Sequence, residues 1–226
     1  MKRIQPAGLM WMMVAMIFCG CAVTTIYSVN MDYTAEKAFI PSYLKPDQKA
    51  LSSIIGVAEF IDTRKIDDPL VIGYVVEKNG TRVLVLPKHS RPTEAVAQGI
   101  RVYLRKAGYN VSGVGEKWDL QEHSIPQRAN GKILIGGAIE EIDINCPRAL
   151  PANTYTTKIK LTIYLADSVH KKILHRSTVE STTLLTHLSF SEERMGDQVG
   201  IALGEGIEKI FENKELAQKI KEGLER

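Results

Sequence analysis

A strict alternation of apolar and polar side chains around residue 160 constrains the fold more than any other feature of this chain. The alternating segment reads Lys158, Ile159, Lys160, Leu161, Thr162, Ile163, Tyr164 and Leu165. Neighbouring residues of a strand point to opposite faces, so the pattern predicts a strand with one buried face and one wet face. Such a strand is typical of an antiparallel sheet.

Other segments predict further strands. Apolar runs at 54–61, 70–76 and 81–86 indicate strands, and Asn79-Gly80 between the last two favours a tight hairpin turn. The segments 133–144 and 172–185 complete the set, with a turn at 168–171 before the last. The apolar parity changes at Glu140-Glu141, which predicts a β-bulge there.

Two main helices are predicted. The first begins near Pro92 and ends at Gly108, and the second begins near Ser191, which is a good N-cap residue. A short charged helix from Lys214 to Glu225 follows. The fold class is therefore α+β in the order β-ββ-α-βββ-α. We expect a mostly antiparallel sheet of about five to six strands, with two main helices packed on one face.

The first twenty residues resemble a secretory leader. Lys2 and Arg3 precede an apolar run from Leu9 to Phe18, which is too short for a bilayer core that needs roughly twenty residues. The tetrapeptide Phe18-Cys19-Gly20-Cys21 resembles the lipobox of bacterial lipoproteins, although Phe18 stands where the family usually has leucine. The resemblance implies cleavage between Gly20 and Cys21, with Cys21 carrying diacylglycerol and palmitate.

This resemblance divides the chain into a signal peptide (1–20), a lipidated N-terminus and tether (21–50), and a single periplasmic domain (51–226). The tether has no clear period, and its scattered aromatic residues predict that part of it docks on the domain. The family's inner-membrane members typically carry Asp after the cysteine, and this chain has Ala22. The inner leaflet of the outer membrane is therefore favoured over the inner membrane.

The charge balance argues against nucleic acid as a partner. The formal net charge is +3, from 29 Lys and Arg against 26 Asp and Glu, and Lys2 and Arg3 lie in the leader. The rest of the chain is nearly neutral and has no strong electrostatic reason to bind phosphate backbones. The expected partners are the membrane, through acyl chains on Cys21, and a protein or polymer of the envelope.

No pattern of reactive residues predicts catalysis, a metal or a cofactor. The five histidines lack metal-ligand spacing, and Cys146 has no companion cysteine, so we expect it to be buried and inert. Glu140, Glu141 and Asp143 are the densest carboxylates near a strand. Adjacent strand residues point to opposite faces, so Glu140 and Glu141 could cooperate only if a bulge turns one of them. The simpler interpretation is a solvated sheet face.

Two sets of residues are candidate interaction surfaces. A basic set on the wet sheet face could meet anionic polymers or headgroups, or could simply be solvated: Lys158, Lys160, Lys171, Lys172 and Arg176. A row of small residues on the last helix permits close backbone approach, either in tight packing on the sheet or in an exposed docking groove: Gly196, Gly200 and Gly204. The loop from Gly113 to Gly131 is a further candidate.

Short motifs resemble the YajG-type family of small envelope lipoproteins. They are Glu59-Phe60-Ile61-Asp62-Thr63-Arg64, Ile72-Gly73-Tyr74 and the passage from Leu104 to Val111. The resemblance implies placement and fold, and no functional residue carries over except Cys21. The expected function is a non-catalytic interaction or accessory module facing the periplasm. Alternatives are an accessory subunit of an envelope transport or secretion system, and a small-ligand-binding protein or enzyme that uses the sheet face.

Overall fold

The computed structural model describes residues 25–115, 117–126 and 131–225. The expected signal peptide, its cleavage site at Gly20 and the expected lipidation site Cys21 lie outside the described residues. Among the described residues, no helix combines the length and apolar character needed to cross a membrane.

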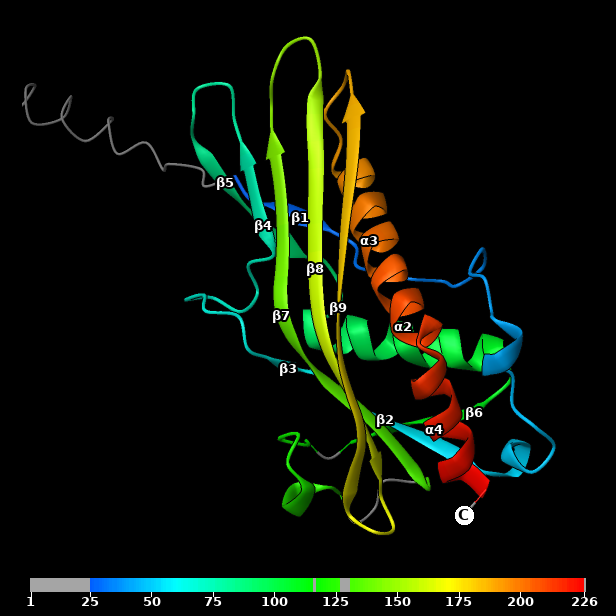
Figure 1. Ribbon diagram of the computed structural model, residues 1–226. Coiled ribbons are helices and arrows are strands. Elements are labelled where there is room, and N and C mark those ends of the chain that lie inside the picture. The colour runs from blue at the N-terminus through cyan, green and yellow to red at the C-terminus, as the bar shows by residue number, and fades with distance from the viewer. Residues whose placement is uncertain (1–24, 116, 127–130, 226) are drawn as a thin grey trace, which may run out of the picture.

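Three antiparallel strands are the longest of the sheet (Figure 1). They are β7 (Ile133–Pro147), β8 (Asn153–Asp167) and β9 (Lys172–His187). In β8 the odd-numbered residues from Tyr155 to Leu165 are buried, as the alternation predicted. The register of β7 against β8 shifts between Ile139 and Glu141, which confirms the predicted bulge.

Six shorter strands extend the sheet on the other side of β7. They are β1 (Tyr27–Val29), β2 (Ile54–Ala58), β3 (Ile61–Asp62), β4 (Gly73–Val76), β5 (Arg82–Pro87) and β6 (Asn110–Val114). The predicted hairpin joins β4 to β5, and Gly80 in its turn has a φ of 82°. The strands β2, β3 and β4 all run parallel to β7, and β1 runs parallel to β5.

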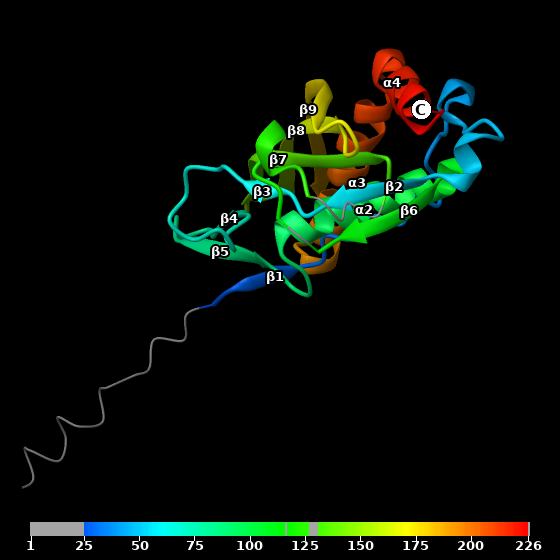
Figure 2. The same cartoon turned by 90° about the horizontal axis from the view of Figure 1, so that it is seen from below.

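The α+β class is confirmed, but the sheet is larger and more mixed than expected. It has nine strands rather than five or six. Five of its pairings are parallel, because β2, β3 and β4 each join β7, β1 joins β5, and β6 joins β2. The connection through α2 returns the chain beside β2 in the same direction, as a helical crossover does. Figure 2 shows β2 and β6 side by side along α2.

Three helices pack against the sheet. The first, α2 (Pro92–Ala107), ends at Gly108 with a φ of 104°, as its sequence predicted. The second, α3 (Glu192–Glu212), is capped by Ser191, whose hydroxyl accepts a hydrogen bond from the Arg194 amide. The third, α4 (Lys214–Glu225), follows at once. The apolar faces of all three helices join one core with the buried side chains of the sheet.

The segment after β6 covers part of the opposite sheet face. Trp118, Leu120 and Ile125 are buried there against Leu134 and Ala138 of β7. A Cβ added to Gly136 would lie 2.6 Å from the Trp118 ring, so the glycine permits this contact. The predicted loop is confirmed over residues 117–126, where the chain is irregular apart from a short 3-10 turn (Glu122–Ser124). Its first residue, Gly113, lies in β6 instead, and the apolar side chains of the loop form a second, smaller core.

The chain from residue 25 to 50 lies on the body of the protein. The Tyr27 hydroxyl donates to Glu77 at 2.6 Å, and the Tyr43 hydroxyl donates to the Glu212 carbonyl at 2.8 Å. The Lys106 ammonium donates to the carbonyls of Ala35, Glu36 and Ala38 at 2.6–3.0 Å. The docking predicted from the aromatic residues is thus confirmed for this part of the chain.

Candidate functional site

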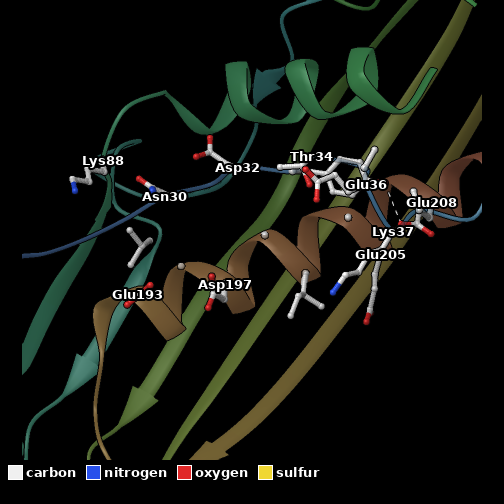
Figure 3. Close-up of a pocket in the computed structure, with 18 of the residues that line it drawn as sticks. Asn30, Asp32, Thr34, Glu36, Lys37, Lys88, Glu193, Asp197, Glu205 and Glu208 are labelled. Carbon is white, nitrogen blue, oxygen red and sulfur yellow. Dashed lines mark hydrogen bonds between the residues drawn. The ribbon is translucent and has the colours of Figure 1, made fainter. Parts of the chain in front are cut away.

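A large cavity lies between the N-terminal segment and α3 (Figure 3). It has a volume of about 1000 Å³ and is open to solvent. Residues 28–38 form one wall, and the side of α3 from Glu192 to Glu208 forms the other. We call this feature the acidic groove. Its position follows from β1, which pairs with β5 and lays the next residues along the helix.

The glycine row on α3 lies against the N-terminal segment. A Cβ on Gly196 would lie 3.4 Å from the Asn30 nitrogen, and one on Gly200 would lie 2.7 Å from the Asp32 carbonyl oxygen. A Cβ on Gly204 would lie 2.7 Å from the Tyr33 ring. The close approach expected of this row is thus made to residues 30–33 rather than to the sheet. The sheet-facing glycine of α3 is Gly206, whose Cβ would meet Ser181 at 3.9 Å.

Hydrogen bonds fix the two walls to each other. The Tyr33 hydroxyl donates to Glu208 at 3.1 Å, and the Ser28 amide donates to Glu192 at 3.0 Å. Burial raises the pKa of the Tyr33 hydroxyl above its ordinary value, and the adjacent Glu208 carboxylate raises it further. Tyr33 therefore stays protonated and keeps its role as a donor across the physiological range.

The groove carries a strong excess of negative charge. Its carboxylates come from both walls, and Figure 3 labels all of them except Glu192: Asp32, Glu36, Glu192, Glu193, Asp197, Glu205 and Glu208. Its cations are Lys37 and Lys88. No salt bridge within the described residues neutralises any of the seven carboxylates. A cleft lined by one sign of charge concentrates ions of the opposite sign.

Sequence reasoning missed this site, although part of its signal was present. Glu193, Asp197 and Glu205 stand four or eight residues apart on α3, so they share one side of the helix. The acidic row lies beside the glycine row on the helix surface, because Asp197 directly follows Gly196 and Glu205 directly follows Gly204. The facing wall was hidden because residues 28–38 show no strand or helix period.

The predicted basic set is largely engaged within the protein. Lys160 forms a salt bridge with Glu140 at 3.2 Å, and the Arg176 guanidinium lies 5.2 Å from the centre of the Tyr164 ring. The Lys171 ammonium donates to the carbonyls of Ile125 and Pro126 at 2.8 and 2.9 Å. Lys158 lies opposite Asp143 on β7, and Lys172 lies opposite Asp167 on β8. Binding of anionic polymers by this set stays a prediction.

The three carboxylates near the bulge line a smaller cavity. Glu140, Glu141 and Asp143 surround it together with Arg64 and Tyr74, and its volume is about 260 Å³. The bulge allows Glu140 and Glu141 to border one space, which regular strand geometry would prevent. A hydrogen bond from the Thr162 hydroxyl, opposed by desolvation and aided by Lys160, holds the pKa of Glu140 below its ordinary value.

A lowered pKa keeps Glu140 ionised, whereas a general acid at neutral pH needs a raised one. The Arg64 guanidinium forms a salt bridge with Asp62 at 2.7 Å and donates a hydrogen bond to the Val71 carbonyl at 2.8 Å. These internal contacts already pair its charge. The described residues contain no group of three or more His, Cys, Asp or Glu side chains arranged to hold a metal ion.

No protein-family model matches the chain, and no curated protein matches it. Among solved structures, protein XCC0632 from Xanthomonas campestris, described under the family model DUF330, matches with a TM-score of 0.53 and 13% identity. The match covers 86% of this chain and 96% of that one. At this identity the likeness shows a shared fold.

Weaker matches include bacterial lipoproteins. Lipoprotein GNA1162 from Neisseria meningitidis matches with a TM-score of 0.40 and 11% identity, over 71% of this chain and 99% of that one. The LpoB C-terminal domain from Salmonella enterica matches with a TM-score of 0.32 and 7% identity, over 60% of this chain and 86% of that one. TM-scores below 0.5 do not establish a common fold.

Proposed function

We propose that this chain is a lipid-anchored protein of the bacterial envelope that acts without catalysis, by binding a cationic segment of an envelope partner in the acidic groove. The observation that carries the proposal is the groove itself, with seven carboxylates against two lysines around about 1000 Å³. The leader and the lipobox-like Cys21 support the anchor. The YajG-type motifs agree with placement in the envelope.

The charge of the groove identifies the chemistry of the partner. A segment rich in lysine or arginine would be drawn into the groove by its field, and its side chains would form charge-assisted hydrogen bonds with the carboxylates. Of these, Glu193 and Asp197 lie on the exposed side of the first turns of α3, and their carboxylates accept no hydrogen bond from the described residues. They are the first contacts that we expect a cationic partner to make.

Photo-crosslinking in intact cells tests the proposal. A photoreactive amino acid at Asp197 should yield adducts with a specific envelope protein, and the same group at the exposed Asp67 should not. Changing Glu193 and Glu205 to lysine in the Asp197 background should suppress the adducts. Equal labelling from both positions, or adducts that survive the charge reversal, would contradict groove binding. The identity of the adduct also distinguishes a free-standing module from a subunit of a transport or secretion system.

The enzyme alternative has less support. The cavity beside Glu140 and Glu141 is small, and the pKa of Glu140 is shifted away from the value that acid catalysis needs. The non-catalytic interpretation rests on this geometry, and the same crosslinking experiment, which captures macromolecules, would favour it over a small-ligand enzyme.

A further inference from the structure

We propose that one end of the molecule docks on the bilayer surface, with Leu150 and Leu188 in contact with lipid. This end, which we call the loop end, consists of three segments: the β4–β5 turn (77–81), the β7–β8 turn (148–152) and the residues after β9 (188–190). The proposal rests on the proposed acylation of Cys21. Its occupant is a phospholipid surface.

The covalent path from the anchor is short. Five residues lie between Cys21 and Tyr27, the first residue of β1, and a fully extended chain spans at most about 20 Å over that length. β1 is fixed to the body, because it pairs with β5 and the Tyr27 ring packs 5.0 Å from the Phe190 ring. An acylated Cys21 would therefore hold the folded protein close to the membrane surface rather than at the end of a long tether.

The direction of β1 sets which end faces the bilayer. β1 is parallel to β5, with Tyr27 level with Val85 and Val29 level with Pro87. β5 begins at Arg82, directly after the β4–β5 turn. Ile26, directly before Tyr27, therefore lies on the side of that turn, and its side chain is 45% exposed.

Contacts join the three segments into one end. Arg148 forms a salt bridge with Glu77 at 2.8 Å, which links the first two turns. The Asn153 side-chain amide donates to the Leu188 carbonyl at 3.2 Å, which links the β7–β8 turn to the end of β9. In Figure 1 both turns and the end of β9 point to the top of the view.

Large apolar side chains are exposed at this end. Leu150 is 80% exposed in the β7–β8 turn, Leu188 is 77% exposed after β9, and Leu184 near the end of β9 is 68% exposed. Single exposed leucines are ordinary, but a group beside a membrane anchor is the arrangement of a lipid-contacting surface. Lys78 and Arg82 flank the first turn, where they would meet anionic headgroups.

Tryptophan fluorescence in vesicles tests the docking. The acylated protein, cleaved before Cys21 and therefore without Trp11, is reconstituted in phosphatidylcholine–phosphatidylglycerol vesicles that contain brominated acyl chains, which quench tryptophan on contact. The variants Leu150→Trp and Leu188→Trp report on the loop end. Val169→Trp is the control, because Val169 is 67% exposed in the β8–β9 turn at the other end of the strands. The emission of buried Trp118, measured in the unsubstituted protein, is subtracted.

We expect Leu150→Trp and Leu188→Trp to lose emission in brominated vesicles and to shift to the blue, while Val169→Trp does neither. Acylated protein that floats with the vesicles but shows equal quenching at both ends would overturn the docking and leave the anchor intact. Absence of the acyl mass on Cys21 would instead refute the proposed function. A blue shift of Leu150→Trp without vesicles, growing with protein concentration, would assign the loop end to a second copy and also overturn the docking.

Discussion

The Tyr33 hydroxyl donates a hydrogen bond to Glu208 at 3.1 Å across a sequence separation of 175 residues. This contact ties the N-terminal segment to α3 at the Glu208 end of the acidic groove. The tyrosine ring also lies over Gly204, where an added Cβ would approach it to 2.7 Å. Tyr33 thus joins the two walls of the groove, and the position of its ring explains why α3 has a glycine at position 204.

Replacing Tyr33 with phenylalanine should weaken this wall. The ring packing remains, but Glu208 loses a donor, so the free energy of unfolding should fall by about 1 kcal/mol. Urea denaturation followed by circular dichroism measures the change. Tyr74→Phe is the control, because the Tyr74 hydroxyl makes no hydrogen bond within the described residues. An equal loss in both variants would show that the Tyr33 contact adds nothing specific.

Gly200→Ala should destabilise the protein although alanine favours helix. The new Cβ would lie 2.7 Å from the Asp32 carbonyl oxygen, and backbone must move to relieve the clash. We expect a loss of about 1 to 3 kcal/mol in the free energy of unfolding. Gly206→Ala in the same helix meets nothing closer than 3.9 Å, so it should be neutral or stabilising by up to about 1 kcal/mol. A neutral Gly200→Ala would mean that the N-terminal segment does not lie on the helix.

Glu140→Gln should lower stability at neutral pH and leave it unchanged in acid. The pKa of Glu140 is depressed in the folded protein, chiefly by the Thr162 hydroxyl and then by Lys160. The charged form therefore adds stability that is present above the ordinary carboxylate pKa and is lost as pH falls through the folded value. The pair is partly exposed, so the difference at pH 7 should be under about 1 kcal/mol. Urea titrations at pH 7 and pH 3 check it: the difference should shrink toward pH 3, and a difference as large at pH 3 as at pH 7 would contradict the assignment.

Cys146 should resist alkylation until the protein unfolds. Burial raises the pKa of its thiol to about 11, and the side chain is fully buried. At pH 8 about one molecule in a thousand would carry the thiolate even if reagent could reach it. Iodoacetamide followed by mass spectrometry should find Cys146 unmodified in native protein and fully modified in urea. Rapid native labelling would show that β7 opens at this position.

Cys21→Ser should abolish membrane attachment. Without the thiol no acyl chain can be added, so labelled palmitate should no longer enter the protein, which should become soluble or keep its leader. Metabolic labelling and fractionation measure both results. Cys146→Ser is the matched control and should leave labelling unchanged. Labelling that persists in Cys21→Ser would refute lipidation at this residue.

The sequence predicted elements whose signals are local. The alternation around Ile159, the Asn79-Gly80 turn, the stop at Gly108 and the bulge near Glu140 all depend on neighbours within a few residues. It did not predict β1, because three residues are too few to show a period. The parallel pairing of β2 with β7 was also hidden, since it depends on a crossover rather than on any residue within either strand.

The candidate site was predicted in part. The glycine row on α3 was identified from its spacing, but the sequence left open whether it packs on the sheet or lines an exposed docking groove, and it did not indicate residues 30–33 as the neighbour. Only tertiary contacts such as Lys106 to the Ala35 carbonyl place that segment on the body. The burial of Trp118 was missed for a similar reason, since the loop around it has no regular pattern and gains its order from Gly136 on a distant strand.

The two walls of the groove come from opposite ends of the polypeptide, as the contact from Ser28 to Glu192 over 164 residues illustrates. A chain emerging from a membrane presents its leading wall first and the other wall last, and closing so long a loop is slow. A molecule that lacks either wall therefore offers no complete groove. Any partner that recognises both walls would therefore bind only molecules in which residues 28–38 have folded against α3.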